Sequence, residues 1–385
     1  MVEFPIYMDN HSTTCVDPRV LESMLPYFCK QYGNAASVNH VFGWRAGEAV
    51  ESARAQVASL LNADPKAVIF TSGATESNNI ALKGVLRSAP PGSNLIVNAA
   101  EHKAILDPAK ALHKEGYSET VLPVDRYGMV DPQRIADSIE PTTVLVSVMF
   151  ANNEVGSINP IAEIAKLCRE RGVLFHTDAT QAVGKVPINL ESVPIDLLSL
   201  SAHKFYGPKG IGALYVRRGE PRVRIEPLVD GGGHERRLRS GTLPVPLIVG
   251  IGAACALSQS SMEEESARIR GLRDRLWSGL QARINDIHLN GHPELRLSGN
   301  ANVSFSGVNS EALMMQLKDV VALSSGSACT TADPEPSHVL TAMGVSEELI
   351  ESTIRFGIGR FNNADEIEIV LEQLADSVKK LRGLS

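Results

Sequence analysis

Lys204 stands where a lysine amine could act as a nucleophile. It follows an apolar run, Ile195 to Leu200, that predicts a short buried strand, and it lies beside Ser201 and His203. Burial and neighbouring cations lower the pKa of a lysine from about 10.4, and a neutral amine forms Schiff bases with carbonyl compounds. The alternative is a surface lysine in the turn that Tyr206 to Gly210 predicts.

A carboxylate upstream of this lysine favours the first interpretation. Val173 to His176 predicts another strand, and Asp178 follows it at once. The chain between Asp178 and Lys204 has room for a turn, a connection and one more strand, so both residues can stand at the ends of nearby strands. A carboxylate that keeps a pyridinium nitrogen protonated and a lysine that forms a Schiff base are the pair that pyridoxal phosphate (PLP) requires. Together they favour a PLP site over an ordinary aspartate at a strand end.

The elements around these residues predict how they are positioned. Strand and helix patterns alternate through this region, which is typical of a mostly parallel sheet with helices on both faces. Ligands of such sheets bind at the carboxyl ends of the strands. Polar clusters occur at five such ends: SGAT after Phe70, AEH ending at His102, NNE after Ala151, DATQ after His176 and SAHK after Leu200.

The first of these clusters has the features of an anion site. A strand runs into Thr71, Ser72 and Gly73, and a helix begins near Ala74 or Thr75. Free backbone N–H groups and the helix dipole attract a phosphate at such a turn, although a plain helix cap would have the same residues. The glycine fingerprint of a dinucleotide-binding fold does not follow any predicted strand here.

Composition narrows the class of protein. The chain has 385 residues and a net charge of −7, so it has no basic surplus for nucleic acid. We find no apolar run of membrane-spanning length and no signal-peptide pattern at the start, and we therefore expect a cytoplasmic protein. The five cysteines are scattered and never spaced CxxC, which predicts neither disulfides nor a metal site. We expect a large domain over residues 13–256 and a small α+β domain from residues 1–12 and 257–385.

Two residues of the last third could also act on a substrate. Cys329 lies in SSGSACTTADPEPSHVL, a run that predicts an exposed loop. An exposed thiol suggests a chemical use, although it can also be accidental. Arg355 lies in an apolar strand pattern, where its guanidinium needs an anion, either a substrate carboxylate or an internal acid.

With these residues identified, the chain resembles the cysteine desulfurases of the IscS/NifS type, in the class V branch of the fold type I PLP enzymes. The resemblance covers essentially the whole length. It implies a large domain with a seven-stranded, mostly parallel sheet and a smaller α+β domain. The matching stretches are FTSGATESNN, EHKAIL, ANNEVG, HTDATQAVGK, SLSAHKFYGPKG, GGGHERRLRSGT, SSGSACT and IRFGIGR. The chain reads AHK where the family usually has GHK.

The resemblance implies a role for each candidate residue. Lys204 carries the cofactor as a Schiff base, Asp178 pairs with its pyridine nitrogen, and His102 stacks on the ring and exchanges a proton with the substrate thiol. Other cofactor contacts come from Asn152 and Gln181 at the ring hydroxyl, from Ala74, Thr75, Ser201 and His203 at the phosphate, and from Thr242 of the partner subunit in a homodimer. Asn34 and Arg355 are expected to bind the substrate carboxylate.

The implied activity is removal of sulfur from L-cysteine, which leaves L-alanine and a persulfide on Cys329. The sulfur then passes to an acceptor such as an IscU-type scaffold, where Cys329 can contact an iron–sulfur cluster. A tRNA-thiolation relay or a nitrogenase-maturation partner stays open. Selenocysteine lyase, cystine or cysteine β-lyase and aminotransferase activities share the fold but need no protein thiol, so the Cys329 loop argues against them. A PLP fold that acts only as a scaffold is a further alternative, which intact Lys204, Asp178 and Cys329 disfavour.

Overall fold

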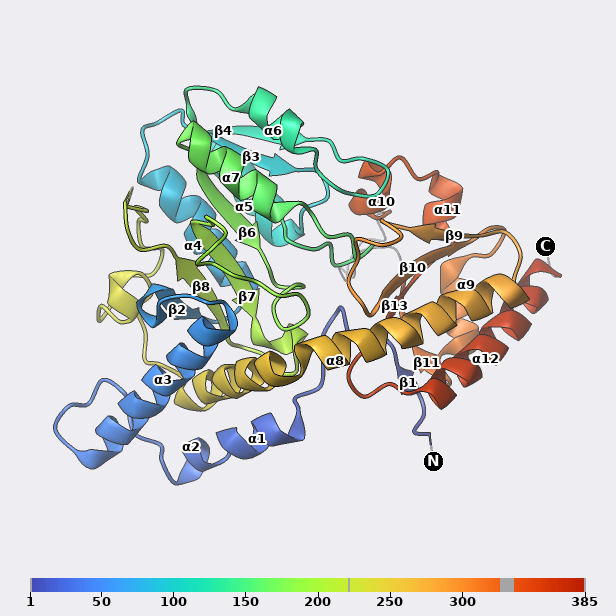
Figure 1. The fold of residues 1–385 in the computed structure, drawn as a ribbon, viewed down its shortest axis with the longest axis horizontal. Coiled ribbons are helices and arrows are strands. Elements are labelled where there is room, and N and C mark those ends of the chain that lie inside the picture. Colours follow the sequence, from blue (N-terminus) through green and yellow to red (C-terminus); the bar gives the residue numbers. More distant parts are fainter. Residues whose placement is uncertain (1, 221, 326–335, 384–385) are drawn as a thin grey trace.

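The computed structural model describes residues 2–220, 222–325 and 336–383 (Figure 1). Its larger sheet has seven strands in the order β2-β8-β7-β6-β5-β3-β4, and β8 runs antiparallel to both of its neighbours. The remaining pairs are parallel. The predicted mostly parallel seven-stranded sheet is therefore confirmed. The strands are β2 (Val68–Thr71), β3 (Asn94–Asn98), β4 (Ser118–Leu122), β5 (Thr143–Ser147), β6 (Leu174–Asp178), β7 (Leu197–Ser201) and β8 (Gly212–Val216).

Helices cover both faces of this sheet. On one face, α4 (Ala74–Arg87) and α5 (Lys103–Lys114) bury aliphatic side chains against the strands. A larger apolar core fills the other face, beneath α3 (Val41–Leu60), α6 (Pro132–Ser138), α7 (Ile161–Arg171) and the first half of α8 (Val245–Arg283). Strands buried on both faces explain the continuous apolar runs of the sequence.

A smaller antiparallel sheet, with the order β12-β13-β10-β9, forms the second part of the molecule. Its strands are β9 (Ile287–Asn290), β10 (Asn300–Phe305), β12 (Ser324–Ser325) and β13 (Thr353–Gly357). The second half of α8, α9 (Ser310–Leu317) and α12 (Ala364–Arg382) pack on it around a separate apolar core. Two short helices, α10 (His338–Ala342) and α11 (Glu347–Glu351), follow the segment 326–335.

Helix α8 connects the two parts without a break (Figure 1). It has 39 residues, and the predicted change of domain near Leu257 falls inside it. Side chains up to Cys255 belong to the core of the large sheet, and those from Ile269 onward belong to the small one. By length and hydropathy α8 could also cross a membrane. It is nevertheless a core helix here, because its buried residues pack in both apolar cores.

The N-terminal segment runs between the two parts. β1 (Ile6–Tyr7) pairs in parallel with β11 (Val321–Ala322) of the small part. Farther along, Thr14 N donates to His203 O at 2.8 Å in the large part. Asp17 and Pro18 have the residue types of a helix start, and the sequence predicts a single helix over Pro18–Tyr32. The structure has two helices there instead, α1 (Pro18–Met24) and α2 (Pro26–Cys29). Pro26 has no N–H to continue the first helix and opens the second.

A buried ion pair fixes the edge strand β2. The guanidinium of Arg54 on α3 binds both carboxylate oxygens of Glu235 at 2.8 Å, and it also donates to Val68 O. Glu235 accepts from Phe70 N at 2.7 Å. The glycine- and arginine-rich loop that contains Glu235 is therefore held against the sheet.

Removing one partner of this pair should destabilise the fold. Arg54→Met would leave the Glu235 carboxylate buried without its cation, which costs roughly 3 kcal/mol in the free energy of unfolding. Urea unfolding followed by circular dichroism measures the loss. Lys166→Met is the control, because Lys166 pairs with Glu170 on the exposed face of α7 and such pairs contribute about 0.5 kcal/mol or less. Equal midpoints for the two variants would contradict the structural role of Arg54.

Candidate active site

One cavity of about 780 Å³ opens at the carboxyl ends of the parallel strands. This volume suits a cofactor together with a small substrate. All five polar clusters predicted from the strand ends contribute to its wall, from Ser72–Glu76, His102, Asn153–Glu154, Asp178–Gln181 and Ser201–Lys204. The N-terminal residues His11–Thr13 and, from the small part, Ser324, Ser325, His338 and Arg355 complete it.

Lys204 lies at the end of the short helix Ala202–Lys204 that follows β7. Its Nζ donates to two backbone carbonyls of the N-terminal segment, His11 O at 2.8 Å and Ser12 O at 2.5 Å. Burial, with the nearby Arg355 guanidinium, lowers the pKa of Lys204 to about 8. The amine is thus far more available as a nucleophile near neutral pH than an ordinary lysine, as the sequence predicted.

Asp178, the last residue of β6, is buried beside the cavity. Asn78 Nδ2 of α4 donates to its Oδ2 at 2.8 Å, and Thr180 N donates to its Oδ1 at 2.9 Å. Donors to both oxygens stabilise the charged carboxylate. A fixed negative charge at this position is what a pyridinium nitrogen requires.

His102 caps the N-terminus of α5, and its ring is exposed to the cavity. Its Nδ1 accepts from Ala104 N at 3.0 Å, so that Nε2 carries the ring proton in the neutral form. Desolvation by the surrounding protein lowers the pKa of His102, and the charges of Lys204 and His338 lower it further while Asp178 opposes them. The ring is therefore neutral near pH 7 and able to exchange a proton.

The other end of the cavity has the features of a phosphate site. Gly73, with φ of 152°, turns the chain so that α4 begins at Ala74 with its N-terminal N–H groups free. A Cβ on Gly212 would lie 2.7 Å from Gly73 Cα, so glycine there lets β8 approach this turn closely. Ser201 and His203 line the same wall. Burial and the neighbouring lysines lower the pKa of His203 to about 4.

Two residues predicted at the ring hydroxyl differ in placement. Gln181 lines the cavity. Asn152 is fully buried behind it, where its Oδ1 accepts from Glu154 N and Val155 N and its Nδ2 donates to Ala100 O. The amide of Asn152 thus holds the NNE loop in shape.

Asn34 and Thr242 do not line the cavity of their own chain. Both are exposed, and the Oδ1 of Asn34 accepts from Ala36 N at 2.9 Å. Ala36 and Leu243, in the same two loops, border a separate hollow of about 300 Å³. The two loops therefore lie side by side on the surface.

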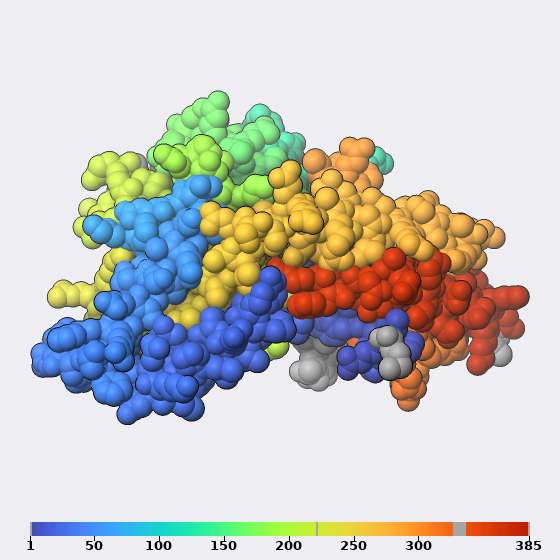
Figure 2. Space-filling view, turned by 60° about the horizontal axis from the view of Figure 1, so that its bottom comes forward, coloured from blue at the N-terminus to red at the C-terminus, as the bar shows by residue number. Residues whose placement is uncertain are grey.

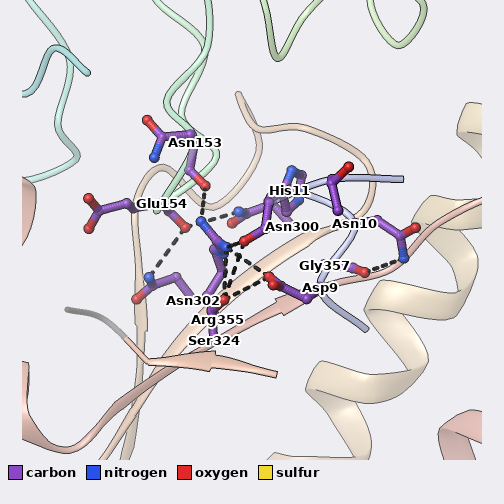
Figure 3. Close-up of polar contacts among 12 residues, drawn as sticks. Asp9, Asn10, His11, Asn153, Glu154, Asn300, Asn302, Ser324, Arg355 and Gly357 are labelled. Carbon is purple, nitrogen blue, oxygen red and sulfur yellow. Dashed lines mark hydrogen bonds and ion pairs between the residues drawn. The ribbon is translucent and has the colours of Figure 1, made fainter. Parts of the chain in front are cut away.

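Arg355, on β13 of the small part, lines the cavity. Its Nη2 donates to Asp9 Oδ1 at 2.8 Å, to Ser12 Oγ at 2.7 Å and to Ser324 Oγ at 3.1 Å, and its Nη1 donates to Asn153 O at 2.9 Å (Figure 3). Its Nε is buried and has no hydrogen-bond partner among the described residues. An internal acid is thus present, and among the described contacts Nη1 keeps a second N–H for an anion.

Cys329 lies outside the described residues. Ser325, directly before the segment 326–335, and His338, shortly after it, both line the cavity.

The sequence did not indicate the contribution of the N-terminal segment. His11 and Ser12 act through backbone carbonyls, which no side-chain pattern reveals. Asp9 and Asn78 form side-chain contacts to predicted residues, but each comes from a distant part of the chain. The polar run NHSTT directly after PIYMD was the available signal.

Comparison with known proteins agrees with this geometry. The aminotransferase class-V family matches residues 6–370. A cysteine desulfurase IscS of Anaeromyxobacter dehalogenans (strain 2CP-C) is 53% identical over 385 residues, which are 100% of this chain and 95% of that protein. Among solved structures, a NifS-like protein superposes with a TM-score of 0.91 at 36% identity, over 98% of this chain and 100% of that one.

A second solved structure, SspA in complex with cysteine, superposes with a TM-score of 0.82 at 35% identity, over 93% of this chain and 100% of that one. Family and fold thus agree over nearly the full length. The chain belongs to the aminotransferase class-V family and, within it, to the cysteine desulfurases.

Proposed function

We propose that this PLP-dependent cysteine desulfurase works through Lys204, Asp178, His102, Arg355 and Cys329. The observation that carries the proposal is that a desolvated amine, a fixed carboxylate and a partly unpaired guanidinium face one cavity. The residues present fit PLP, with a phosphate site at one end and a carboxylate at the other. When bound, PLP acts as an electron sink for the amino acid attached to it.

The cofactor contacts are proposed residue by residue. Lys204 would hold the aldehyde carbon, Asp178 the ring nitrogen, and His102 one ring face. Gln181 faces the ring hydroxyl from the cavity wall, and Asn152 supports the loop behind it. The phosphate would be held by Ala74, Thr75, Ser201 and His203, and by Thr242 of a partner subunit.

The chain's own residues then act on the substrate. Arg355 binds the carboxylate of L-cysteine through the second N–H of Nη1, and Asn34 of the partner subunit assists it. Lys204 removes the Cα proton, which its lowered pKa favours. His102 accepts or returns the proton of the substrate thiol.

Cys329 is the proposed sulfur acceptor. Its thiolate forms an S–S bond with the substrate sulfur, the Cβ–S bond breaks, and the electron pair stays with the carbon skeleton. Protonation of that carbon releases L-alanine. The persulfide would then pass its sulfur to an acceptor protein, such as an IscU-type scaffold, where Cys329 can contact the cluster under assembly. The exposed free thiols Cys15 and Cys29 suit a reducing compartment, and we propose the cytoplasm.

A homodimer is proposed from an exposed apolar patch on α1, α2 and the start of α3, at the lower left of Figure 2. Soluble surfaces rarely expose so many large apolar side chains together unless they bind a partner. Asn34 and the loop of Thr242 adjoin this region, so both could reach the cavity of a second subunit. The patch comprises Leu21, Leu25, Phe28, Tyr32, Val38, Val41, Phe42 and Trp44.

Lys204 can be tested by trapping the cofactor. Borohydride reduction of the wild-type protein with PLP should attach the cofactor to Lys204, and Lys204→Ala should remove both the attachment and turnover. Capture of PLP by the apoprotein should speed up from pH 7 to pH 9, since the amine loses its proton near its pKa of about 8. Lys209→Ala is the control, because Lys209 lines the same cavity and should leave the attachment unchanged. Attachment elsewhere in the wild type would refute the assignment.

Cys329→Ser separates cofactor chemistry from sulfur transfer. The variant should bind PLP and L-cysteine as the wild type does, but sulfide and alanine formation should fall at least about a hundredfold because the acceptor thiol is gone. Cys15→Ser is the matched control and should keep full activity. Products are measured as alanine, pyruvate and sulfide. Pyruvate with ammonia in place of alanine would show β-elimination and exclude the proposed role of Cys329.

Mixing two inactive variants tests the contribution of Thr242 across the dimer. Lys204→Ala lacks the amine, and Thr242→Asp should repel the phosphate. Each mixed dimer should then contain one intact site, with Lys204 from one subunit and Thr242 from the other. We expect activity to reappear after subunit exchange. If the mixture stays inactive while mass spectrometry shows mixed dimers, Thr242 does not act across the interface.

A further inference from the structure

A partly buried lysine that the proposed mechanism does not use lies behind the cavity wall. Lys185 follows Gln181 by one helical turn, in a segment whose backbone bonds run from Ala182 N and Val183 N to Ala179 O and from Lys185 N to Ala182 O. Its Nζ donates to Gln181 Oε1 at 3.1 Å. None of the described carboxylates forms an ion pair with it. A cation in such a place needs a structural or functional reason, because desolvation disfavours its charge.

Three polar groups contact the side-chain amide of Gln181. Its Nε2 donates to His11 O at 2.8 Å. Its Oε1 faces Lys185 Nζ and His11 Nδ1, each at 3.1 Å. The Lys185 ammonium donates to Oε1, and the His11 carbonyl accepts from Nε2. A flipped amide would face a donor with its N–H and an acceptor with its oxygen, so the two groups together exclude it.

The imidazole of His11 could not by itself select this orientation. With Nδ1 protonated, its imidazole donates to Oε1; with Nδ1 unprotonated, it would accept from a flipped Nε2 equally well. Burial, with the charge of Lys185 next, lowers the pKa of His11 well below its usual value, so the ring is neutral and free to change tautomer. Protonated Lys185 limits the Gln181 amide to one orientation, because an ammonium group can only donate and therefore pairs with the carbonyl oxygen Oε1.

The orientation matters because Gln181 lines the large cavity, whereas Lys185 lines a separate hollow of about 20 Å³. The hydrogen bond to Lys185 holds the Oε1 of Gln181. The second hydrogen of Nε2, which His11 O does not use, is left for the cavity.

We propose that Lys185 is a positioning residue that keeps the N–H of Gln181, and not its carbonyl oxygen, turned toward the ring oxygen of the cofactor. This proposal rests on the proposed function, in which Gln181 faces that oxygen. A donor there stabilises negative charge on the ring oxygen, whereas a flipped amide would present a second acceptor and repel it.

The surroundings of Lys185 set the pH range over which it excludes the flipped amide. Burial lowers its pKa to about 7, Lys204 and Arg355 lower it as well, and Glu265 opposes them. The protonated amine can only donate, whereas the neutral amine has a lone pair that could accept from a flipped Nε2. The positioning effect of Lys185 is therefore strongest below about pH 7, and above that pH the His11 carbonyl still favours the observed orientation.

The test measures two quantities. The first is the pH at which the visible absorption of bound PLP changes, and the second is the dissociation constant of the complex between PLP and the apoprotein. Lys185→Met should raise the pH of the spectral transition by about one unit and weaken PLP binding about tenfold. Each effect corresponds to about one hydrogen bond to a charged group. Lys185→Arg keeps a donor to Oε1 and should restore most of both values. Lys166→Met removes an exposed lysine and should match the wild type.

A double-mutant cycle shows whether Lys185 acts through Gln181. In a Gln181→Ala background, Lys185→Met should cause little further shift. An equal shift in both backgrounds would overturn the proposal, because Lys185 would then act by its charge alone. No shift in the wild-type background would also overturn it.

Gln181→Glu provides an independent variant if Lys185→Met does not fold. A carboxylate has no donor to turn toward the cavity, so this variant should show the same upward shift. An unchanged transition in Gln181→Glu would refute the inference. If the wild-type protein itself bound no PLP, the proposed function would fail instead, so the two failures are distinguishable.

Discussion

The site depends on one stretch of backbone, residues 9–14, that lies between the two sheets. The carbonyls of His11 and Ser12 receive the Lys204 amine, and the same His11 carbonyl receives the amide of Gln181. Asp9 and the hydroxyl of Ser12 hold the Arg355 guanidinium. A single segment thus sets the separation between the Lys204 amine and the Arg355 guanidinium. Neither sheet positions both groups by itself, because Lys204 follows a strand of the large sheet and Arg355 lies in the small one.

The charges around this segment explain why the cavity suits anions. Lys204, Lys185 and Arg355 are close enough to lower the pKa values of the two lysines, and burial adds to the effect. Asp178 balances only part of this charge. A bound phosphate and a substrate carboxylate would relieve the repulsion among the cations, so ligand binding and folding of the site stabilise each other. The same repulsion keeps the Lys204 amine partly neutral, as nucleophilic attack requires.

The sequence predicted those parts of the site that depend on local pattern. Apolar runs that end in polar clusters located Asp178, His102 and Lys204 at one edge of the sheet, because parallel strands bring their carboxyl ends together. It could not predict contacts made by backbone atoms or between distant segments, such as those of His11 O. The break at Pro26 was overlooked because apolar spacing continues across it. Asn34 and Thr242 are exposed away from the cavity of their own chain, and Asn152 is engaged by its own loop, which composition does not show.

The position of the N-terminal segment also bears on how the protein is made. The amide of Asn10 donates to the carbonyl of Gly357, 347 residues away, and β1 pairs with a strand near residue 321. These residues leave the ribosome well before their partners are synthesised. The large sheet can therefore form early, while the carbonyls that bind the Lys204 amine are not held in place until the small sheet has been made. A polypeptide interrupted before residue 321 would have the large sheet without the contacts that position this segment.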